Sequence, residues 1–206
     1  MRYFSKNYTL TSNVFGFSNF ATGTNWVLER NSVDDLVGNI VIVISLNANF
    51  YPGEFVLLEG LDADGNPQTE EVALPGDGDV SFSLKYFSYL SSATASVSTD
   101  TMGLGWTSAS STPTIPIDGN SNSSSAISVY VDQVGVNYTV QETFANIYDA
   151  YPSTLPWSNI DGLVDGTISA NATATKGVRA IRLIAAPSID PITVGLILHQ
   201  ASNPTF

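Results

Sequence analysis

Residues 53–74 read GEFVLLEGLDADGNPQTEEVAL, and this stretch indicates the class of fold. The apolar run at 53–61 and the weakly alternating run at 67–74 are typical of β-strands. Between them lies the pair Asp64–Gly65. Asp-Gly is a strong hairpin signal, because glycine accepts a positive φ and aspartate bonds to nearby backbone. The stretch therefore predicts two antiparallel strands joined by a tight turn.

The acidic residues of this turn also raise the possibility of a calcium site. Asp62, Asp64 and Asn66 match the first ligand positions of an EF-hand loop. However, Gly65 and Pro67 occupy the wrong positions for that loop, and no helix pattern flanks it. The hairpin turn is favoured over a bound cation at Asp62 and Asp64, so we expect no metal and no cofactor.

The chain offers few residues for catalysis. Glu70 and Glu71 are adjacent, and adjacent side chains on a strand point to opposite faces, so they cannot form a carboxylate pair. The only histidine is His199, near the end of the chain, and no Gly-x-Ser-x-Gly elbow accompanies it. We expect a protein that is not an enzyme. A hydrolase remains as an alternative, and it requires a pocket lined by His199 and acids.

The pattern stays β elsewhere in the first half. Residues 39–46, NIVIVISL, form a β-branched run that predicts a buried strand. Residues 80–90 alternate, so that Val80, Phe82 and Leu84 fall on one face. No long apolar stripe of helical period is present, and the chain is therefore expected to be all-β.

Two further hairpins are expected in the second half. The runs at 126–133 and 136–144 are separated by a short turn and predict one hairpin. The runs at 177–185 and 192–200, joined through APSID, predict another. Regularly spaced short strands with turn signals point to sandwiches or barrels.

This layout predicts two small, jelly-roll-like β-sandwich domains joined by a linker. The stretch TSASSTPTIPIDGNSNSSS is rich in Ser, Asn and Pro, a composition typical of linkers. The expected boundaries are an N-terminal arm at residues 1–24, a domain at 25–107, the linker at 108–125 and a domain at 126–206.

Composition and charge exclude several classes of partner. The 206 residues include 7 Lys and Arg against 19 Asp and Glu, a net charge of −12. Nucleic acid and anionic membrane surfaces both require clustered basic residues, so neither is an expected partner. The chain has no cysteine, which excludes disulfides and thiolate chemistry. The N-terminus shows no signal-peptide pattern, and we expect synthesis and folding in a cytoplasm.

Several motifs resemble a group of small structural proteins of tailed bacteriophages. These motifs are GLDADGNPQTEEVALPG, TIPIDG, VNYTVQETF, and GVRAIRLIA followed by ITVGLILHQA. The resemblance covers about residues 53–201, and the first 50 residues depart from it. It implies a virion component that decorates or cements the capsid surface, or one at the head–tail region, with the major capsid protein or other virion proteins as partners. A tail or head-fibre module that binds host surface glycans through aromatic residues is the alternative.

Candidate contact residues follow from the chemistry of interfaces, whose cores are enriched in aromatic side chains and arginine. Residues 143–157 carry tyrosine and tryptophan in irregular chain, and the N-terminal arm carries spaced aromatics that are expected to lie across a neighbour. Packing in the chain's own core is the competing interpretation. A homo-oligomer, dimer or trimer, is expected. The candidate interface residues are Tyr3, Phe4, Tyr8, Phe15, Phe17, Tyr148, Tyr151, Trp157, Arg179 and Arg182.

Overall fold

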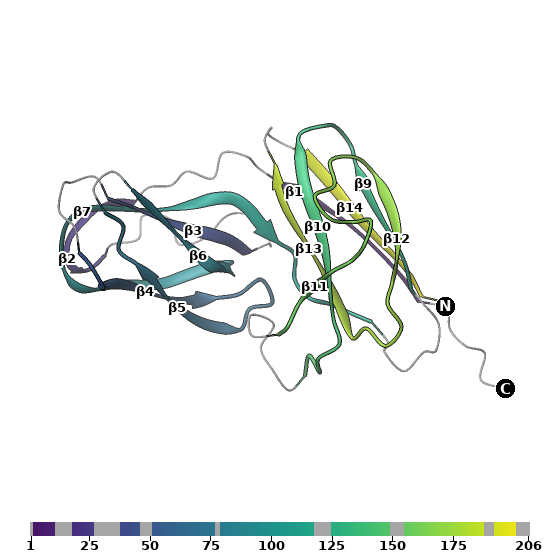
Figure 1. Cartoon of the computed structure of the whole chain (residues 1–206), viewed down its shortest axis with the longest axis horizontal. Helices are drawn as coiled ribbons and strands as arrows, with labels where there is room; N and C mark the ends of the chain where they lie inside the picture. Colours follow the sequence, from purple (N-terminus) through teal and green to yellow (C-terminus); the bar gives the residue numbers. More distant parts are fainter. Residues whose placement is uncertain are drawn as a thin grey trace. The chain divides into compact units, whose positions relative to one another are not determined.

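Figure 1 shows the computed structural model of the chain, which is built from antiparallel strands. The described residues form strands and turns and include no helix, which confirms the all-β prediction. The chain makes two compact units, a terminal unit of Met1–Ser12 with Ser111–Phe206, and an inserted unit of Asn13–Ser110. The structure describes residues 2–10, 18–26, 38–45, 51–76, 79–117, 125–148, 155–187 and 192–200.

The terminal unit contains two antiparallel groups of strands. The first has the order β1-β14-β9-β12, with bounds Arg2–Leu10, Ile192–Gln200, Ser125–Val131 and Ala170–Ala174. The second has the order β11-β10-β13-β8, with bounds Ser158–Asn159, Val136–Thr143, Ala180–Pro187 and Ile115–Pro116. In both groups one row of side chains is buried, so the unit is sandwich-like.

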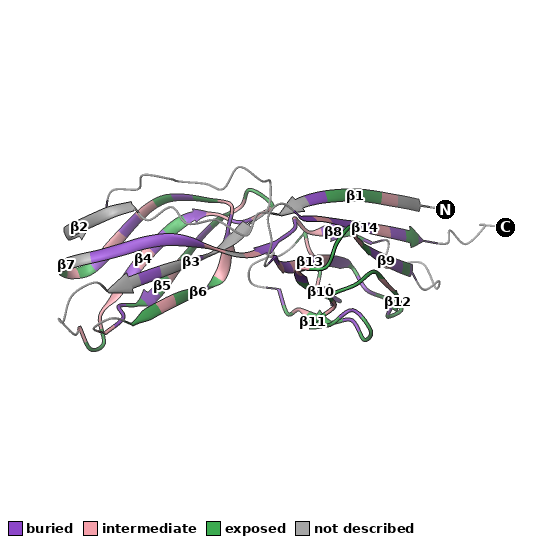
Figure 2. Cartoon of the chain, turned by 90° about the horizontal axis from the view of Figure 1, so that it is seen from above, coloured by how far each residue is buried: buried purple, intermediate pink, exposed green. Residues whose placement is uncertain are grey.

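The core of the terminal unit is formed mainly by every second side chain along its strands. Val129 on β9 and Leu196 on β14 are buried from one group of strands, and Tyr138 on β10 and Leu183 on β13 are buried from the other. Figure 2 shows buried and exposed residues following one another along these strands. Each large apolar side chain that is fully buried contributes roughly 1.5–3 kcal/mol, so these rows supply most of the stabilisation.

The inserted unit is organised around one long strand. Its strands are β2 (Ser18–Asn25), β3 (Gly38–Ser45), β4 (Phe55–Leu61), β5 (Pro67–Ala73), β6 (Val80–Phe87) and β7 (Tyr89–Ser111), whose last residue belongs to the terminal unit. β7 pairs with β4 along its first part and with β2 further on, and the path of neighbouring strands runs β5-β4-β7-β3-β6. The core contains Trp26, Val41, Leu58, Phe87 and Trp106.

Side chains join the two ends of this path, β5 and β6. In the described part of the chain β5 pairs with β4, and it reaches β6 through side chains. The Glu70 carboxylate accepts hydrogen bonds from the backbone N–H groups of Leu84 at 2.6 Å and Lys85 at 2.9 Å. Gln68 Nε2 donates to the carbonyl of Tyr86 at 2.6 Å. We call this set of contacts the β5–β6 seam.

The hairpin expected at residues 53–74 is confirmed. β4 and β5 pair antiparallel from Phe55↔Ala73 to Leu61↔Pro67. Within the turn, Gly65 has φ +82° and donates its N–H to the carbonyl of Asp62 at 3.0 Å. A glycine is needed there, because few other residues adopt a left-handed backbone without strain.

The two hairpins expected in the second half are wrong in their pairing. The strands themselves form, as β9, β10, β13 and β14. However, β9 pairs with β12 and β14, whereas β10 pairs with β11 and β13. Each short connection therefore carries the chain from one group of strands to the other. Each strand of such a pair buries one of its faces. Because the two strands lie in different groups, their buried faces pack into the same core.

The expected arm and linker also differ from the structure. Arg2–Leu10 forms β1, which pairs along its whole length with β14 of the same chain, and Ser18–Asn25 forms β2. Without β1, strand β14 would be an edge strand with unpaired backbone N–H and C=O groups. Pairing with β1 satisfies these groups, which explains why this polar segment joins the sheet. Residues 108–111 continue β7 and Ile115–Pro116 forms β8, and residues 118–124 of the linker lie outside the described residues.

Candidate interaction surfaces

One surface of the terminal unit combines a tryptophan and an arginine from the predicted contact residues. The guanidinium of Arg182 on β13 lies over the Trp157 ring, 4.4 Å from its centroid. Arg182 Nε donates to Gln141 Oε1 at 2.9 Å, and Gln141 Nε2 donates to Asn159 Oδ1 at 2.9 Å. These contacts follow from strand register, since Gln141 on β10 is opposite both Arg182 and Asn159.

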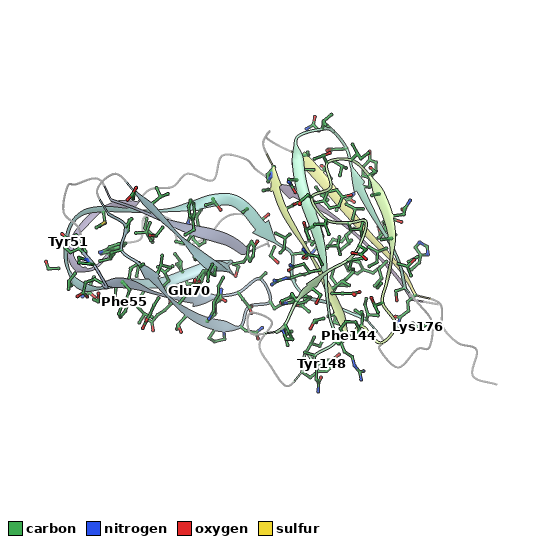
Figure 3. The ribbon with its side chains drawn as sticks, in the orientation of Figure 1. Tyr51, Phe55, Glu70, Phe144, Tyr148 and Lys176 are labelled. Atoms are coloured by element: carbon green, nitrogen blue, oxygen red, sulfur yellow. The ribbon has the colours of Figure 1, made fainter. Side chains whose placement is uncertain are left out.

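Two exposed aromatic residues follow the same strand. Phe144 comes directly after β10 and is 52% exposed, and Tyr148 is 84% exposed. Figure 3 shows both at the same end of the unit. The backbone of Tyr148 is held by a turn in which its N–H donates to Asn146 Oδ1 at 3.2 Å. Arg179 is exposed and its N–H donates to the carbonyl of Thr143, so it lies next to the end of β10.

We call Phe144, Tyr148, Trp157, Arg179 and Arg182 the aromatic–arginine patch. Four of its members were candidates from the sequence, and Phe144 was not. Lone exposed aromatics are common, but a group with arginine has the composition of an interface centre. Because stacking and a hydrogen bond already hold Arg182, ordering this side chain on binding costs little conformational entropy.

A groove in the same unit brings together two candidates from the N-terminal segment. It has a volume of about 530 Å³ and is lined by Phe4, Lys6 and Tyr8 of β1, by Leu198 and Gln200 of β14, and by residues 113–116. The Lys6 ammonium lies 5.2 Å from the centroid of the Tyr8 ring. The volume falls in the range of small-molecule sites. The groove is mostly apolar, and its polar members include Lys6, Thr114 and Gln200.

The other candidates are distributed as follows. Tyr3 lies in β1, opposite His199 in register. Phe15, Phe17 and Tyr151 lie outside the described residues. Tyr8 is buried at 6% exposure, so it contributes to the unit's own core as well as to the wall of the groove.

In the acidic turn, the Asp62 carboxylate accepts hydrogen bonds from the turn's own backbone. Asp62 is buried, and its Oδ1 accepts from the N–H groups of Asp64 and Asn66, both at 2.9 Å. The carbonyl of Asp62 accepts from Ser88 Oγ at 2.5 Å, which ties the turn to the start of β7. The carboxylate therefore organises the loop. Across the described ranges no group of three or more His, Cys, Asp or Glu could hold a metal ion.

Two buried polar side chains in the terminal unit were missed from the sequence. Glu142 accepts from the N–H of Thr175 at 3.0 Å and from its Oγ1 at 2.6 Å. The Tyr138 hydroxyl donates to the carbonyl of Ile168 at 2.8 Å, and burial raises the pKa of this tyrosine above 10.0. Both groups anchor the connection between β11 and β13 to β10. Their partners are distant in sequence, so no local pattern could have identified them.

The residues considered for catalysis are divided between the units: His199 belongs to the terminal unit, and Glu70 and Glu71 belong to the inserted unit. His199 is exposed on β14, between Tyr3 of β1 and Ala126 of β9 in register. Glu70 lies in the β5–β6 seam, whereas Glu71 is exposed. The structure therefore separates Glu70 from Glu71, as alternation along a strand requires.

No protein-family model matches the chain, and no curated protein matches it. Among the residues that the structure describes, none forms a helix long and apolar enough to cross a membrane.

Proposed function

We propose that this chain is a non-enzymatic virion structural protein that decorates or cements a capsid by binding neighbouring shell subunits. The major capsid protein or another virion protein is its partner, and the capsid surface is its location. We also propose that its two units are small jelly-roll-like modules. The resemblance of its sequence motifs to those of tailed-phage structural proteins supports the virion assignment.

The observation that carries the proposal is the aromatic–arginine patch. Trp157 and Arg182 form a preordered pair, and Phe144 and Tyr148, which follow β10 in the same unit, expose large apolar area. Interface hot spots are enriched in tryptophan, tyrosine and arginine. A cement protein acts by burying such area against a shell, where symmetry repeats each contact many times. An interface of ordinary size buries roughly 1,600 Å² in total.

Binding to shells that lack the protein tests this assignment. Purified protein is added to particles of the encoding virus that lack it, and bound protein is measured by co-sedimentation. We expect the variant Phe144→Ser/Tyr148→Ser to bind at least about tenfold more weakly, the equivalent of 1.4 kcal/mol. Both side chains are exposed, so the variant should keep the melting temperature of the native chain.

Tyr130→Ser is the matched control. Tyr130 is 53% exposed on β9, in the other group of strands of the terminal unit. Its replacement should leave shell binding unchanged. Unchanged binding of the Phe144→Ser/Tyr148→Ser variant would rule the patch out as the contact surface, and absence of binding by the native chain would overturn the decoration function itself.

A glycan-binding adhesion module is the second candidate. The exposure of Phe144 and Tyr148 favours it, because exposed aromatic rings provide stacking surfaces for sugar rings. Screening the native chain against an array of bacterial surface glycans separates the two functions. Binding that is lost in Tyr148→Ser supports adhesion, whereas an array without signal together with shell binding supports decoration.

A further inference from the structure

Strand β1 carries a lysine in the row of side chains that faces the core of the terminal unit. Lys6 and Tyr8 lie on one face of the strand, and Tyr8 is buried. Ser5 and Asn7, on the opposite face, are exposed. The register places Lys6 opposite Leu196 of β14, which is also buried. An apolar side chain would bury more apolar area at this position, so packing alone does not account for Lys6.

Lys6 is exposed within this row because the sandwich is open along the edge at β1. The groove lies between β1 and β14 of one group of strands and residues 113–116, which end in β8 of the other group. β1 is the last strand of its group in the described part of the chain, so no further strand there closes this side. The volume of about 530 Å³ is that of a small-molecule site.

The walls of the groove are apolar and provide few hydrogen-bond donors. They consist mainly of Phe4, Tyr8 and Leu198 on one side and Pro113, Ile115 and Pro116 on the other. Proline has no backbone N–H, so Pro113 and Pro116 offer a ligand no main-chain donor. A ligand that fits these walls must therefore have a mainly apolar body.

Lys6 determines the charge of a complementary ligand. It is the charged residue among the described residues that line the groove. Its ammonium lies 5.2 Å from the centroid of the Tyr8 ring, and no carboxylate of the described chain forms an ion pair with it. The ammonium can therefore bind one anionic group without breaking an ion pair. The net charge of −12 disfavours ligands with several negative charges, so a single negative charge fits best.

We propose that this groove binds a small amphipathic monocarboxylate, whose apolar body lies between the walls and whose carboxylate accepts a hydrogen bond from Lys6 Nζ. A hydrogen bond between charged groups is about twice as strong as one between neutral groups, so it selects carboxylates over neutral molecules of the same shape. The proposal does not depend on the virion assignment. The competing interpretation is that Lys6 only protects the edge, because inward-pointing charges discourage edge-to-edge pairing.

Three probes with the same alkyl chain separate the charge from the apolar body: octanoate, octanol and octyltrimethylammonium. Each is added to the isotope-labelled native chain, below its micelle concentration, and amide chemical shifts are followed by NMR. We expect octanoate to shift the signals of Lys6 and Leu198 saturably, and to bind at least about fivefold more tightly than octanol. The cationic probe should bind most weakly. Absence of octanoate binding at the groove, or equal affinities for octanoate and octanol, would overturn the proposal.

Substitution of Lys6 tests the role of its ammonium. Lys6→Met keeps an unbranched side chain and removes the charge, so it should weaken octanoate binding at least about fivefold and leave octanol binding unchanged. Lys6→Arg should retain the preference for octanoate. Lys176→Met is the control, since Lys176 is an exposed lysine of the same unit. Native affinity of Lys6→Met for octanoate would show that the ammonium does not bind the carboxylate. Aggregation of this variant, without octanoate binding by the native chain, would assign Lys6 to edge protection instead.

A groove-filling variant tests where the apolar body lies. Thr114 is half-buried in the wall, and Thr114→Trp should weaken octanoate and octanol binding alike. Leu84→Ser removes an exposed apolar side chain from the inserted unit and should leave both affinities unchanged. The melting temperature checks that Thr114→Trp folds, and if it does not fold, the Lys6 variants decide. Weaker octanoate binding in Leu84→Ser, with native binding in a folded Thr114→Trp, would place the ligand outside the groove and contradict the proposal.

Discussion

At the scale of single residues, the turn at Asp62–Asn66 depends on one backbone angle. Gly65 has φ +82°, and the space around its Cα is open to a side chain. A substitution there is penalised by backbone strain without a steric clash from neighbours. We expect Gly65→Val to lower the free energy of unfolding by about 1–3 kcal/mol, as measured by chemical denaturation. Gly65→Asn should cost less, because asparagine tolerates this region.

Equal losses for Gly65→Val and Gly65→Asn would show that the cost does not arise from backbone conformation. The same denaturation curves test the role of the acidic turn. Chelation with EDTA should leave the melting temperature unchanged, because hydrogen bonds within the loop already use the Asp62 carboxylate. A drop that calcium reverses would contradict this interpretation.

Tyr138 provides a pH-dependent prediction. Burial raises its pKa above 10.0, so the folded chain keeps the proton at a pH where the unfolded chain loses it. Its contribution is complete below about pH 10 and is lost as the pH rises through the raised pKa. At neutral pH, Tyr138→Phe should lose about 1 kcal/mol with the hydrogen bond to Ile168.

The free energy of unfolding, followed between about pH 9 and pH 11, separates this residue from other tyrosines. The native chain should lose stability more steeply than Tyr138→Phe. Tyr130→Phe, at an exposed position, should keep the native slope. Parallel curves for the native chain and Tyr138→Phe would contradict the assignment.

At the scale of elements, the β5–β6 seam joins two strands through side chains. Removal of the Glu70 carboxylate leaves the N–H groups of Leu84 and Lys85 without that acceptor. We expect Glu70→Ala to lower the free energy of unfolding by about 1–3 kcal/mol. Glu71→Ala, at an exposed neighbouring position, should change it by less than about 0.5 kcal/mol. Similar effects of the two substitutions would show that the seam contributes little.

The N-terminal strand gives a second prediction at this scale. β1 pairs with β14 along 9 residues, so the terminal unit needs chain from both ends. We expect residues 13–110 to fold alone with a cooperative thermal transition. Residues 111–206 should not fold until a synthetic peptide of residues 1–12 is added. A fragment of residues 111–206 that melts cooperatively without the peptide would show that β1 is dispensable.

These elements show what the sequence could and could not predict. The β4–β5 hairpin was predicted correctly, because the conformation of Asp64–Gly65 is determined locally. The connection at residues 132–135 is also short, but its length does not indicate whether the chain turns within a sheet or crosses to another. The partner of β1 lies at the opposite end of the chain, where no local signal could indicate it.

The candidate surfaces were predictable to a different degree. The composition of residues 143–157 and the nearby arginines suggested a contact surface, and the structure places Arg182 over the Trp157 ring; whether this is a contact surface stays a prediction. The groove at Phe4 and Tyr8 depends on the pairing of β1 and could not be derived. The alternation at Val80, Phe82 and Leu84 was visible in the sequence, but its outward orientation depends on the seam and on Ser83.

At the scale of the whole molecule, each of the two units exposes large apolar side chains. The aromatic–arginine patch belongs to the terminal unit, and the exposed residues Val80, Phe82 and Leu84 of β6 belong to the inserted unit. A net charge of −12 adds electrostatic repulsion between free copies.

The central claim, the proposal that this chain decorates a capsid, is tested most directly by its copy number in purified particles of the phage proposed to encode it. Quantitative mass spectrometry against the major capsid protein gives this number. A decoration protein repeats with the symmetry of the shell, so we expect on the order of hundreds of copies per particle. A handful of copies would place the chain in a tail or at the head–tail region, and its absence from the particle would contradict a structural role.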